Sequence, residues 1–284
     1  MLQVFAASNY ATELEFMYQT ILAAGKILLA GKEMGPEIAY KSDNSIVTQV
    51  DHACALFLDG EIEKKFPGDA ILNEETYSLA KDTAPWLTAK RCWLLDPLDS
   101  TSSYILNGQH YGIILALALD GKPVVGMTYK PELGELYFAA HGEGAYRAFA
   151  GPSPEFVKVL PVKVSHLTKL HLILSHGRQK TPELVDLLKR LGNPSCHRMN
   201  GSLKINEIAR GEYTAFVSPP QNPMALWDLG ATQVILEEAG GRVTDLMGHP
   251  LNFRDPNLVM SHGIIASNSA THGYILDKLA ATSR

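Results

Sequence analysis

Apolar positions near the start of the chain recur with the spacing of a helix. From about Ser8 to Ala30, apolar side chains fall three or four positions apart, a repeat typical of a helix with one buried face; they are Leu14, Met17, Ile21, Ala24 and Leu28. Gly31 and the Gly35-Pro36 pair are predicted to end this helix. A second helix is expected from Gln49 to Phe66, because Thr48 and Asp51 have the spacing of a capping box.

The middle of the chain shows the clearest β pattern. Two apolar runs, Gly112 to Leu119 and Pro123 to Tyr129, flank Asp120-Gly121 and predict a hairpin. Further strands are expected at Leu136 to Ala140 and Gly144 to Arg147. Shorter apolar runs, Ala70-Ile71-Leu72 and Cys92-Trp93-Leu94-Leu95, read as buried strands. This part of the chain is therefore predicted to be helices packed on an antiparallel sheet.

Strands and helices alternate in the rest of the chain, after a Pro- and Gly-containing linker expected at Ala150 to Pro161. Such alternation favours an α/β layer. The fold class that we predict is α/β (α+β layered), with alternating helix and sheet layers in two packed halves. Residues 1–150 would hold the helices, the antiparallel sheet and most of the metal ligands. Residues 151–284 would form an α/β half that carries Asp228 and the residues that select the substrate.

Composition narrows the classes of protein. The chain has 284 residues and a net charge of −5, which argues against a nucleic-acid-binding surface. It contains neither a signal-peptide pattern nor an apolar run long enough to span a membrane. Cys54, Cys92 and Cys196 are far apart and sit among apolar neighbours, so they are predicted to be buried thiols in a reducing cytoplasm. The oligomeric state is left open by these patterns.

Asp96-Pro97-Leu98-Asp99-Ser100-Thr101 combines two kinds of ligand in one segment. It follows a buried strand, and Pro97 is expected to set a turn that lets Asp96 and Asp99 face one point. Carboxylate and carbonyl oxygens suit Mg²⁺, while the N–H groups of Ser100 and Thr101 at a helix start would suit an anion. Together these are the groups that a metal-assisted phosphatase needs. Helix capping explains the same residue types equally well.

Other charged residues can also be explained without a functional site. Glu74-Glu75 follows the predicted strand at Ala70, where a solvated loop is the ordinary explanation. Asp228 precedes the apolar Leu229 helix, and its ordinary role would be that of an N-cap. Lys204 taken alone would be an exposed helix lysine.

The ordered set of motifs is more specific than any member. Val47-Thr48-Gln49-Val50-Asp51, Asn73-Glu74-Glu75-Thr76, the Asp96 segment and Ala225-Leu226-Trp227-Asp228, with Glu237-Glu238-Ala239-Gly240-Gly241 behind, occur in this order. The chain thereby resembles the inositol monophosphatase superfamily of Mg²⁺-dependent, lithium-sensitive phosphatases over nearly its whole length. Gly108-Gln109-His110-Tyr111 and Gly201-Ser202-Leu203-Lys204 resemble the 3′(2′),5′-bisphosphate nucleotidases within it.

The resemblance implies roles for particular residues. Glu74, Asp96 and the Leu98 carbonyl would bind one Mg²⁺, and Asp96, Asp99 and Asp228 a second, with two or three ions in each active site. Thr101, hydrogen-bonded to Glu74 or Asp51, would orient and deprotonate a metal-held water that attacks the phosphate. The substrate is expected to contact five residues, Ser100, Thr101, Ser202, Lys204 and Asp228.

The implied activity is hydrolysis of a small phosphorylated substrate, 3′-phosphoadenosine 5′-phosphate, to AMP and phosphate. Inositol 1-phosphate or another sugar or polyol phosphate is the enzymatic alternative, and a metal-binding regulatory protein with weakened catalysis is an alternative of another class. Two positions depart from the family pattern. Ser100 replaces a Gly, so the backbone there is expected to avoid positive φ, and Ser102 replaces the Lys that the nucleotidases often carry.

Overall fold

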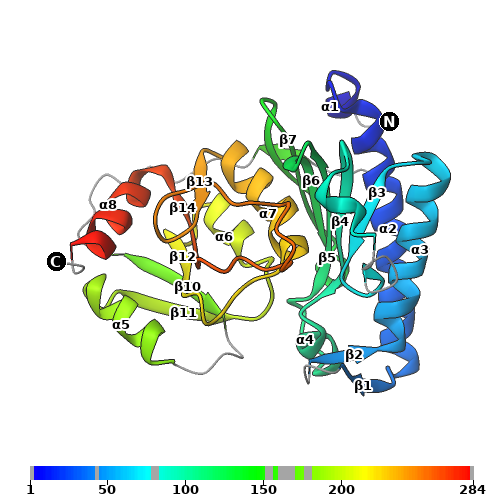
Figure 1. Ribbon diagram of the computed structural model, residues 1–284. Coiled ribbons are helices and arrows are strands. Elements are labelled where there is room, and N and C mark those ends of the chain that lie inside the picture. Colours follow the sequence, from blue (N-terminus) through cyan, green and yellow to red (C-terminus); the bar gives the residue numbers. More distant parts are fainter. Residues whose placement is uncertain are drawn as a thin grey trace.

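Two β-sheets and three pairs of helices form alternating layers in the computed structural model, which describes residues 3–41, 45–77, 83–150, 156–158, 170–175 and 181–281 (Figure 1). The predicted layered α/β class is confirmed. Among the described residues, no helix is both long and apolar enough to cross a membrane.

The larger sheet has seven strands in the order β3-β4-β5-β6-β7-β8-β9. β3 and β4 are parallel, and every later pair is antiparallel. Asp120 and Gly121 make the predicted hairpin turn, with φ of 48° and 76°. The bounds are β3 Ala70–Asn73, β4 Arg91–Asp99, β5 Gly112–Leu119, β6 Lys122–Lys130, β7 Glu135–Ala140, β8 Gly144–Phe149 and β9 Phe156–Lys158.

The second sheet has five strands in the order β11-β10-β12-β14-β13. The first three strands are parallel and the last two pairings are antiparallel, so this sheet is mixed. The bounds are β10 His171–Ser175, β11 Ser195–Met199, β12 Ala215–Ser218, β13 Gly241–Thr244 and β14 Ile264–Asn268. A separate two-stranded hairpin pairs β1 (Ile38–Tyr40) with β2 (Ile46–Thr48).

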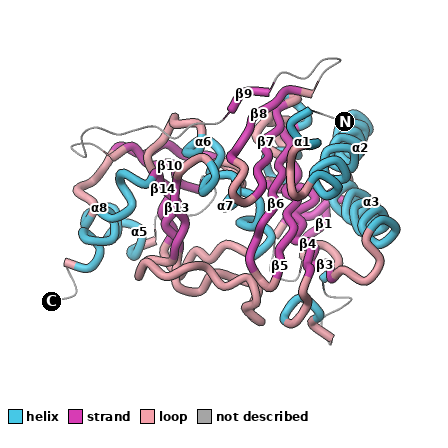
Figure 2. The backbone as a smooth tube through the Cα atoms, turned by 90° about the horizontal axis from the view of Figure 1, so that it is seen from above, coloured by secondary structure: helices cyan, strands magenta, loops and turns pink. Residues whose placement is uncertain are grey.

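Helices separate and cover the sheets (Figures 1 and 2). α2 (Ala11–Met34) and α3 (Gln49–Lys65) pack on the outer face of the seven-stranded sheet, and α6 (Ile205–Ala209) and α7 (Leu226–Glu238) lie between the two sheets. α5 (Pro182–Arg190) and α8 (Ser269–Ala280) cover the far face of the second sheet. The short elements are α1 (Gln3–Ala6), α4 (Thr101–Ile105), and 3-10 helices at Pro85–Leu87 and Pro131–Leu133.

The first predicted helix is confirmed, with one error at its end. All five of its predicted apolar positions are buried in one core cluster between α2, α3 and the large sheet. Gly31, predicted to end the helix, lies inside it. A Cβ at Gly31 would overlap Val50 of α3, so glycine permits the two helices to pack closely. Gly35, with φ of 81°, ends the helix.

Three further predictions on local structure have mixed outcomes. Thr48 and Asp51 do form the capping box of α3. Cys54 and Cys92 are buried, but the prediction for Cys196 was wrong, since it is exposed on β11. Part of the predicted linker at Ala150 to Pro161 is β9, and its other residues from 151 onward lie outside the described part of the chain.

Candidate active site

Asp96 and Asp99 face the same side of the large sheet because β4 is irregular between them. In a regular strand, residues three apart point to opposite faces. Here the pairing with β5 shifts between Asp96 and Asp99, so that two β4 residues oppose Ile113 alone, and such a bulge changes the direction of the following side chain. The turn expected at Pro97 is thus a bulge within a strand, and it brings both carboxylates toward α7.

The turn before α6 holds Asp99 in place. The Asp99 carboxylate accepts hydrogen bonds from the backbone N–H of Ser202, at 2.7 and 2.8 Å to its two oxygens, and of Leu203 at 3.1 Å. Gly201 allows this contact, because its φ is 73° and a Cβ would collide with the Asp99 carboxylate. Ser202, predicted to contact substrate, therefore orients Asp99 through its backbone.

Asp228 reaches the same point from the second half of the chain. It is the third residue of α7, and its carboxylate accepts a hydrogen bond of 3.0 Å from the N–H of Ala225, the residue that precedes the helix. The N-cap position suggested for Asp228 was therefore wrong, although the side chain still caps the helix start. An acid in this first turn is favoured by the helix dipole.

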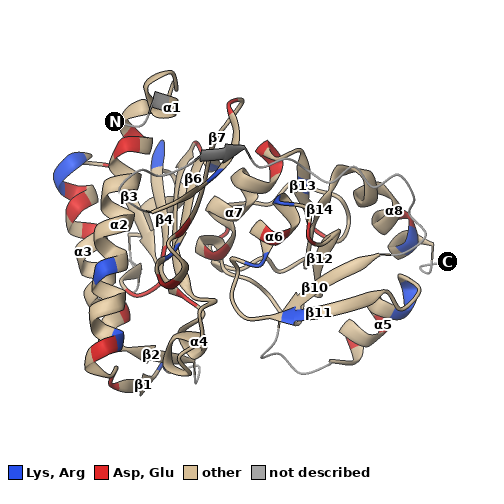
Figure 3. Ribbon diagram, turned by 180° about the vertical axis from the view of Figure 1, so that it is seen from behind, with Lys and Arg blue, Asp and Glu red and all other residues tan. Residues whose placement is uncertain are grey.

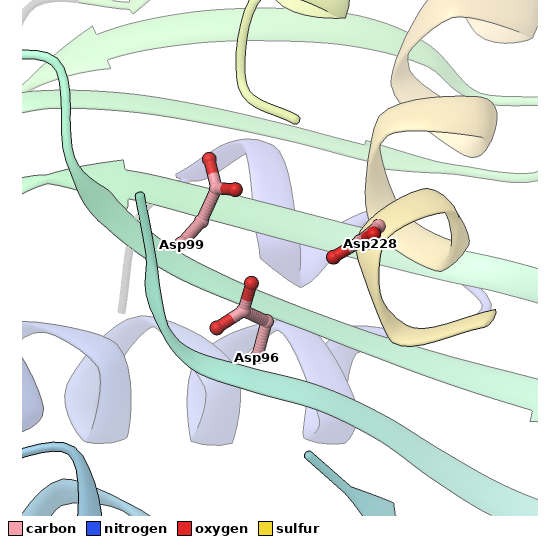
Figure 4. Close-up of side chains that lie close together, drawn as sticks. All are labelled: Asp96, Asp99 and Asp228. Atoms are coloured by element: carbon pink, nitrogen blue, oxygen red, sulfur yellow. The ribbon is translucent and has the colours of Figure 1, made fainter. Parts of the chain in front are cut away.

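The three carboxylates converge on one cavity. One oxygen from each of Asp96, Asp99 and Asp228 lies within 4.8 Å of the others, and Figure 4 shows the side chains turned toward a common space. Asp96 and Asp99 are almost fully buried. Burial, followed by repulsion from Glu74 and Asp99, raises the pKa of Asp228 to about 7. Burial and the neighbouring acids also raise the pKa of Asp96 well above its ordinary value.

Such a cluster fits a divalent cation. Ionised carboxylates this close repel one another, and a cation between them removes that repulsion. The ligand atoms are hard oxygens, which Mg²⁺ prefers. The Leu98 carbonyl belongs to the same bulge and accepts a hydrogen bond of 3.3 Å from the Thr101 hydroxyl, so it too borders the cavity.

Glu74 lines the same cavity, but its carboxylate points to Lys41. Lys41 Nζ lies 2.8 Å from Glu74 Oε1 and 2.7 Å from Glu75 Oε1. Glu75 is buried, with 4% of its side chain exposed, so the solvated-loop explanation of the Glu74-Glu75 pair was wrong for this residue. Burial and then the charge of Glu74 raise the pKa of Glu75 to about 7.

Thr101 pairs with Asp51 rather than with Glu74. Thr101 Oγ1 lies 3.1 Å from Asp51 Oδ1, while Asp51 Oδ2 accepts from the N–H of Thr48 at 2.8 Å and from its hydroxyl at 2.6 Å. Burial raises the pKa of Asp51. The same carboxylate therefore caps α3 and contacts the residue expected to orient the attacking water.

Ser100 contradicts the expected backbone conformation. It precedes α4 with φ of 70° and ψ of 53°, the left-handed conformation that Gly adopts at no steric cost. Its side-chain oxygen is buried and has no hydrogen-bond partner among the described residues. The backbone geometry expected of Gly is therefore retained by Ser, at some cost in strain.

Lys204 is buried rather than exposed. Only 2% of the residue is accessible, and its ammonium group contacts the Gly201 carbonyl and lies 4.7 Å from the centre of the Phe216 ring. Burial raises the pKa of Asp99 and Asp228, and the positive charge of Lys204 only partly opposes that rise. A lysine beside two of the carboxylates thus gives this end of the cavity a fixed positive charge.

The cavity has a volume of about 360 Å³ and includes residues that sequence patterns did not single out. They are Ser45, Ile46, Ser175, Asn200 and Met224, and Ser102, which departs from the nucleotidase pattern, also lines the cavity. Ser175 ends β10 and Asn200 follows β11, at the carboxyl ends of parallel strands where α/β proteins place ligands. Lys41 was missed because a single lysine after an exposed strand carries no pattern of its own.

The chain is similar to known phosphatases in sequence and in structure. The Inositol monophosphatase family profile matches residues 9–284. The 3′(2′),5′-bisphosphate nucleotidase CysQ of Salmonella typhimurium is 30% identical, with 76% of this chain and 83% of that protein covered. Inositol monophosphatase 2 of Solanum lycopersicum is 28% identical, with 79% and 84% covered. Staphylococcal SaIMPase-II, solved with 2′AMP bound, is 26% identical, with a TM-score of 0.75 and 94% and 93% covered.

Fold, site and relatives together define a class of enzyme, the hydrolases of phosphoric monoesters. Within this class, the chain belongs to the inositol monophosphatase family. Magnesium dependence is general in that family. The chain is nearly as similar in sequence to nucleotidases as to inositol monophosphatases, so the percentage of identical residues does not decide which substrate it hydrolyses.

Proposed function

We propose that the protein is a 3′(2′),5′-bisphosphate nucleotidase that hydrolyses 3′-phosphoadenosine 5′-phosphate to AMP and phosphate. The observation that carries the proposal is the convergence of Asp96, Asp99 and Asp228 in one cavity, beside the fixed cation of Lys204. The carboxylates suit a metal-dependent phosphatase, and the additional cation suits a substrate with a second phosphate.

The proposed metal ligands are those that the family resemblance implies, and all of them line the cavity. Asp96 would contribute to both metal positions, together with Glu74 and the Leu98 carbonyl at one and with Asp99 and Asp228 at the other. Magnesium bound there would polarise the phosphoryl oxygen and make water a stronger nucleophile. The hydrogen bonds from Ser202 and Leu203 orient the Asp99 carboxylate, which leaves its remaining lone pairs for a cation.

Thr101 and Asp51 would position the attacking water. The Thr101 hydroxyl donates toward Asp51 or the Leu98 carbonyl, so a lone pair of Thr101 Oγ1 remains for a hydrogen of the water. Asp51 holds the hydroxyl in this orientation because Thr48 fixes its other oxygen. Thr101 Oγ1 would therefore take the proton of the water while its own hydroxyl proton passes to Asp51.

The substrate phosphate would lie against the start of α4. The first N–H groups of a helix have no acceptor within it and favour an anion, and here they belong to Thr101 and the residues next to it. Ser100 brings the chain into this turn and would contribute its own N–H. Lys204, which lines the same cavity, would face the second phosphate.

Two alternatives keep specific support. Inositol 1-phosphate or a related polyol phosphate is supported by the similarity to inositol monophosphatase 2. A regulatory metal-binding protein with weak turnover is supported by the strained Ser100 at the phosphate-binding turn.

Phosphate release from a panel of phosphomonoesters, with and without Mg²⁺, tests the proposal. We expect the highest kcat/KM for 3′-phosphoadenosine 5′-phosphate and no turnover in a chelator. A clear preference for inositol 1-phosphate would support the first alternative, and Mg²⁺ binding without turnover of any substrate would support the second.

A further inference from the structure

A chain of buried charges joins α6 to the large sheet. Lys130, the last residue of β6, lies 3.0 Å from Glu207 of α6 and 3.2 Å from Glu135 of β7, with 3%, 7% and 6% of their side chains exposed. Arg210 pairs with Glu207 at 2.6 Å, and Arg147 pairs with Glu135 at 2.6 Å. Each carboxylate therefore has two cationic partners, and Lys130 is shared by both. None of these five residues lines the active-site cavity.

A second polar contact joins the same two elements. Thr128 lies two residues before Lys130 and therefore on the same face of β6. Its hydroxyl oxygen accepts a hydrogen bond of 2.8 Å from the side-chain amide of Asn206, and both residues are almost fully buried. β6 thus contacts two successive residues of α6, Asn206 and Glu207, through directional polar interactions.

The position of α6 depends on such contacts. The helix has five residues, all of them buried, and a helix this short is not stable by itself. Leu203, Ile205 and Ile208 pack in the core between the two sheets, but apolar packing is non-directional. Hydrogen bonds and ion pairs require particular distances and angles. The contacts with β6 therefore determine where α6 lies along the sheet.

The turn that leads into α6 carries the groups that orient Asp99. The N–H groups of Ser202 and Leu203 in this turn donate to the Asp99 carboxylate. Lys204, which lines the cavity, directly precedes the helix, and its carbonyl accepts a hydrogen bond of 3.1 Å from the N–H of Glu207. A shift of α6 would therefore move the turn and change the direction of the Asp99 carboxylate.

We propose that Lys130 and Glu207 are positioning residues for the metal site, and that their buried ion pair holds α6 where the turn before it directs Asp99 toward a divalent cation. The inference rests on the proposed role of Asp99 as a metal ligand. Neither residue touches the cavity, so both act through the backbone of the turn at Gly201 to Lys204. Loss of the ion pair weakens metal binding although every ligand is still present.

Replacing Lys130 by Met tests the proposal. Glu207 and Glu135 each keep an arginine partner in this variant, so no buried carboxylate is left unpaired. Calorimetric titration should show about tenfold weaker Mg²⁺ binding than in the wild type, the lower end of the effect of removing a group that orients a metal ligand. Arg147→Met is the matched control. It removes an ion pair from the same network but does not contact α6, so it should lower the Tm and leave Mg²⁺ affinity unchanged.

Hydrogen exchange reports the position of the turn in the metal-free protein. The amides of Ser202 and Leu203 should exchange faster in Lys130→Met than in the wild type, because the shift of α6 weakens their hydrogen bonds to Asp99. In Arg147→Met they should exchange as in the wild type. Phosphate release in Lys130→Met should require more Mg²⁺ for half-maximal activity, while kcat at saturating Mg²⁺ is nearly retained. A lower Tm in Lys130→Met without these changes would show that the ion pair serves stability alone.

The double variant Lys130→Met/Glu207→Leu tests the proposal even if Lys130→Met fails to fold. Apolar residues often replace a buried ion pair without loss of stability, and Arg210, whose side chain is one-third exposed, keeps Glu212 as a neighbour. We expect a Tm close to that of the wild type and weaker Mg²⁺ binding, because apolar side chains fill the space without fixing the position of α6. Wild-type Mg²⁺ affinity in this variant overturns the proposal.

The outcomes separate this inference from the proposed function. Unchanged Mg²⁺ affinity in the variants, in a wild type that hydrolyses 3′-phosphoadenosine 5′-phosphate, overturns the positioning role alone. Weaker Mg²⁺ binding together with faster exchange of the turn supports that role even if the wild type prefers another phosphomonoester. A wild type that binds no Mg²⁺ overturns both.

Discussion

Replacing Asp96 by Asn should stabilise the metal-free protein while it abolishes most of the activity. Asp96 is buried beside two other carboxylates, with oxygens of all three within 4.8 Å. At that distance two charges repel by about 3.5 kcal/mol at an effective dielectric of about 20. Asparagine removes this charge and keeps an oxygen that can accept the 3.0 Å hydrogen bond from the N–H of Leu98.

Proton uptake limits the size of the gain. The metal-free cluster can relieve its repulsion by holding a proton, which at pH 7 costs about 4 kcal/mol for a carboxyl with an ordinary pKa of 3.8. We therefore expect Asp96→Asn to raise the free energy of unfolding without metal by about 2–4 kcal/mol. At about 2–4 °C per kcal/mol for a chain of this size, the Tm should rise by several degrees.

Thermal unfolding with a chelator and with Mg²⁺ measures the stability of the metal-free and of the metal-bound protein. The wild type should gain stability from Mg²⁺, whereas Asp96→Asn should gain little, because the ligand proposed to be shared is lost. Phosphate release at saturating Mg²⁺ should fall by orders of magnitude. The control is Asp120→Asn, an exposed turn residue at which Asn tolerates the positive φ. Near-wild-type turnover, or a loss of metal-free stability, would refute the reasoning.

Four further predictions follow from the same site. In a chelator, the wild type should lose stability as the pH rises from about 5 to 7, because the raised pKa of Asp228, about 7, means that the folded state binds more protons than the unfolded chain; denaturant titrations of the wild type and Asp96→Asn at each pH isolate this effect. Lithium should inhibit phosphate release in an uncompetitive or mixed pattern, and complete insensitivity would indicate an altered metal site. Lys204→Ala should lower kcat/KM for 3′-phosphoadenosine 5′-phosphate at least about tenfold, the value of a charge-assisted contact, while sparing inositol 1-phosphate; equal losses on both substrates, also seen in Lys204→Met, would make the lysine structural. Ser100→Gly should stabilise the protein by up to about 1 kcal/mol, because glycine adopts the left-handed conformation without strain; a loss of stability in denaturant unfolding would contradict this.

Local patterns in the sequence were enough for most elements. The hairpin at Asp120-Gly121 and the capping box at Thr48 depend on residues within a few positions of one another, so their physical causes are visible in the sequence. The spacing of the apolar residues from Leu14 to Leu28 likewise shows which face of the helix is buried. Gly31 was misread because its partner, Val50, is on another helix, and a glycine that allows close packing looks like one that ends a helix.

The acidic motifs could be found in order along the chain, but their spatial relation could not. Asp96 and Asp99 share one side of β4 only because the pairing with β5 shifts, and that shift depends on two strands together. Asp228 joins them from α7, more than a hundred residues away, when α7 packs between the two sheets. The family resemblance supplied the expectation of a shared site, and the layered packing supplied the geometry.

Charge states and strain were decided by tertiary structure alone. Figure 3 shows acidic and basic segments interspersed over both halves, and nothing in the order of residues tells which of them meet. Lys41 reaches Glu74 and Glu75, and Lys204 is buried beside the carboxylates, because segments distant in sequence pack together. The sequence determines which charged residues and local turns the chain has. The pKa values and the metal site depend on burial and on the distances between charged groups, and these arise only when the layers pack together.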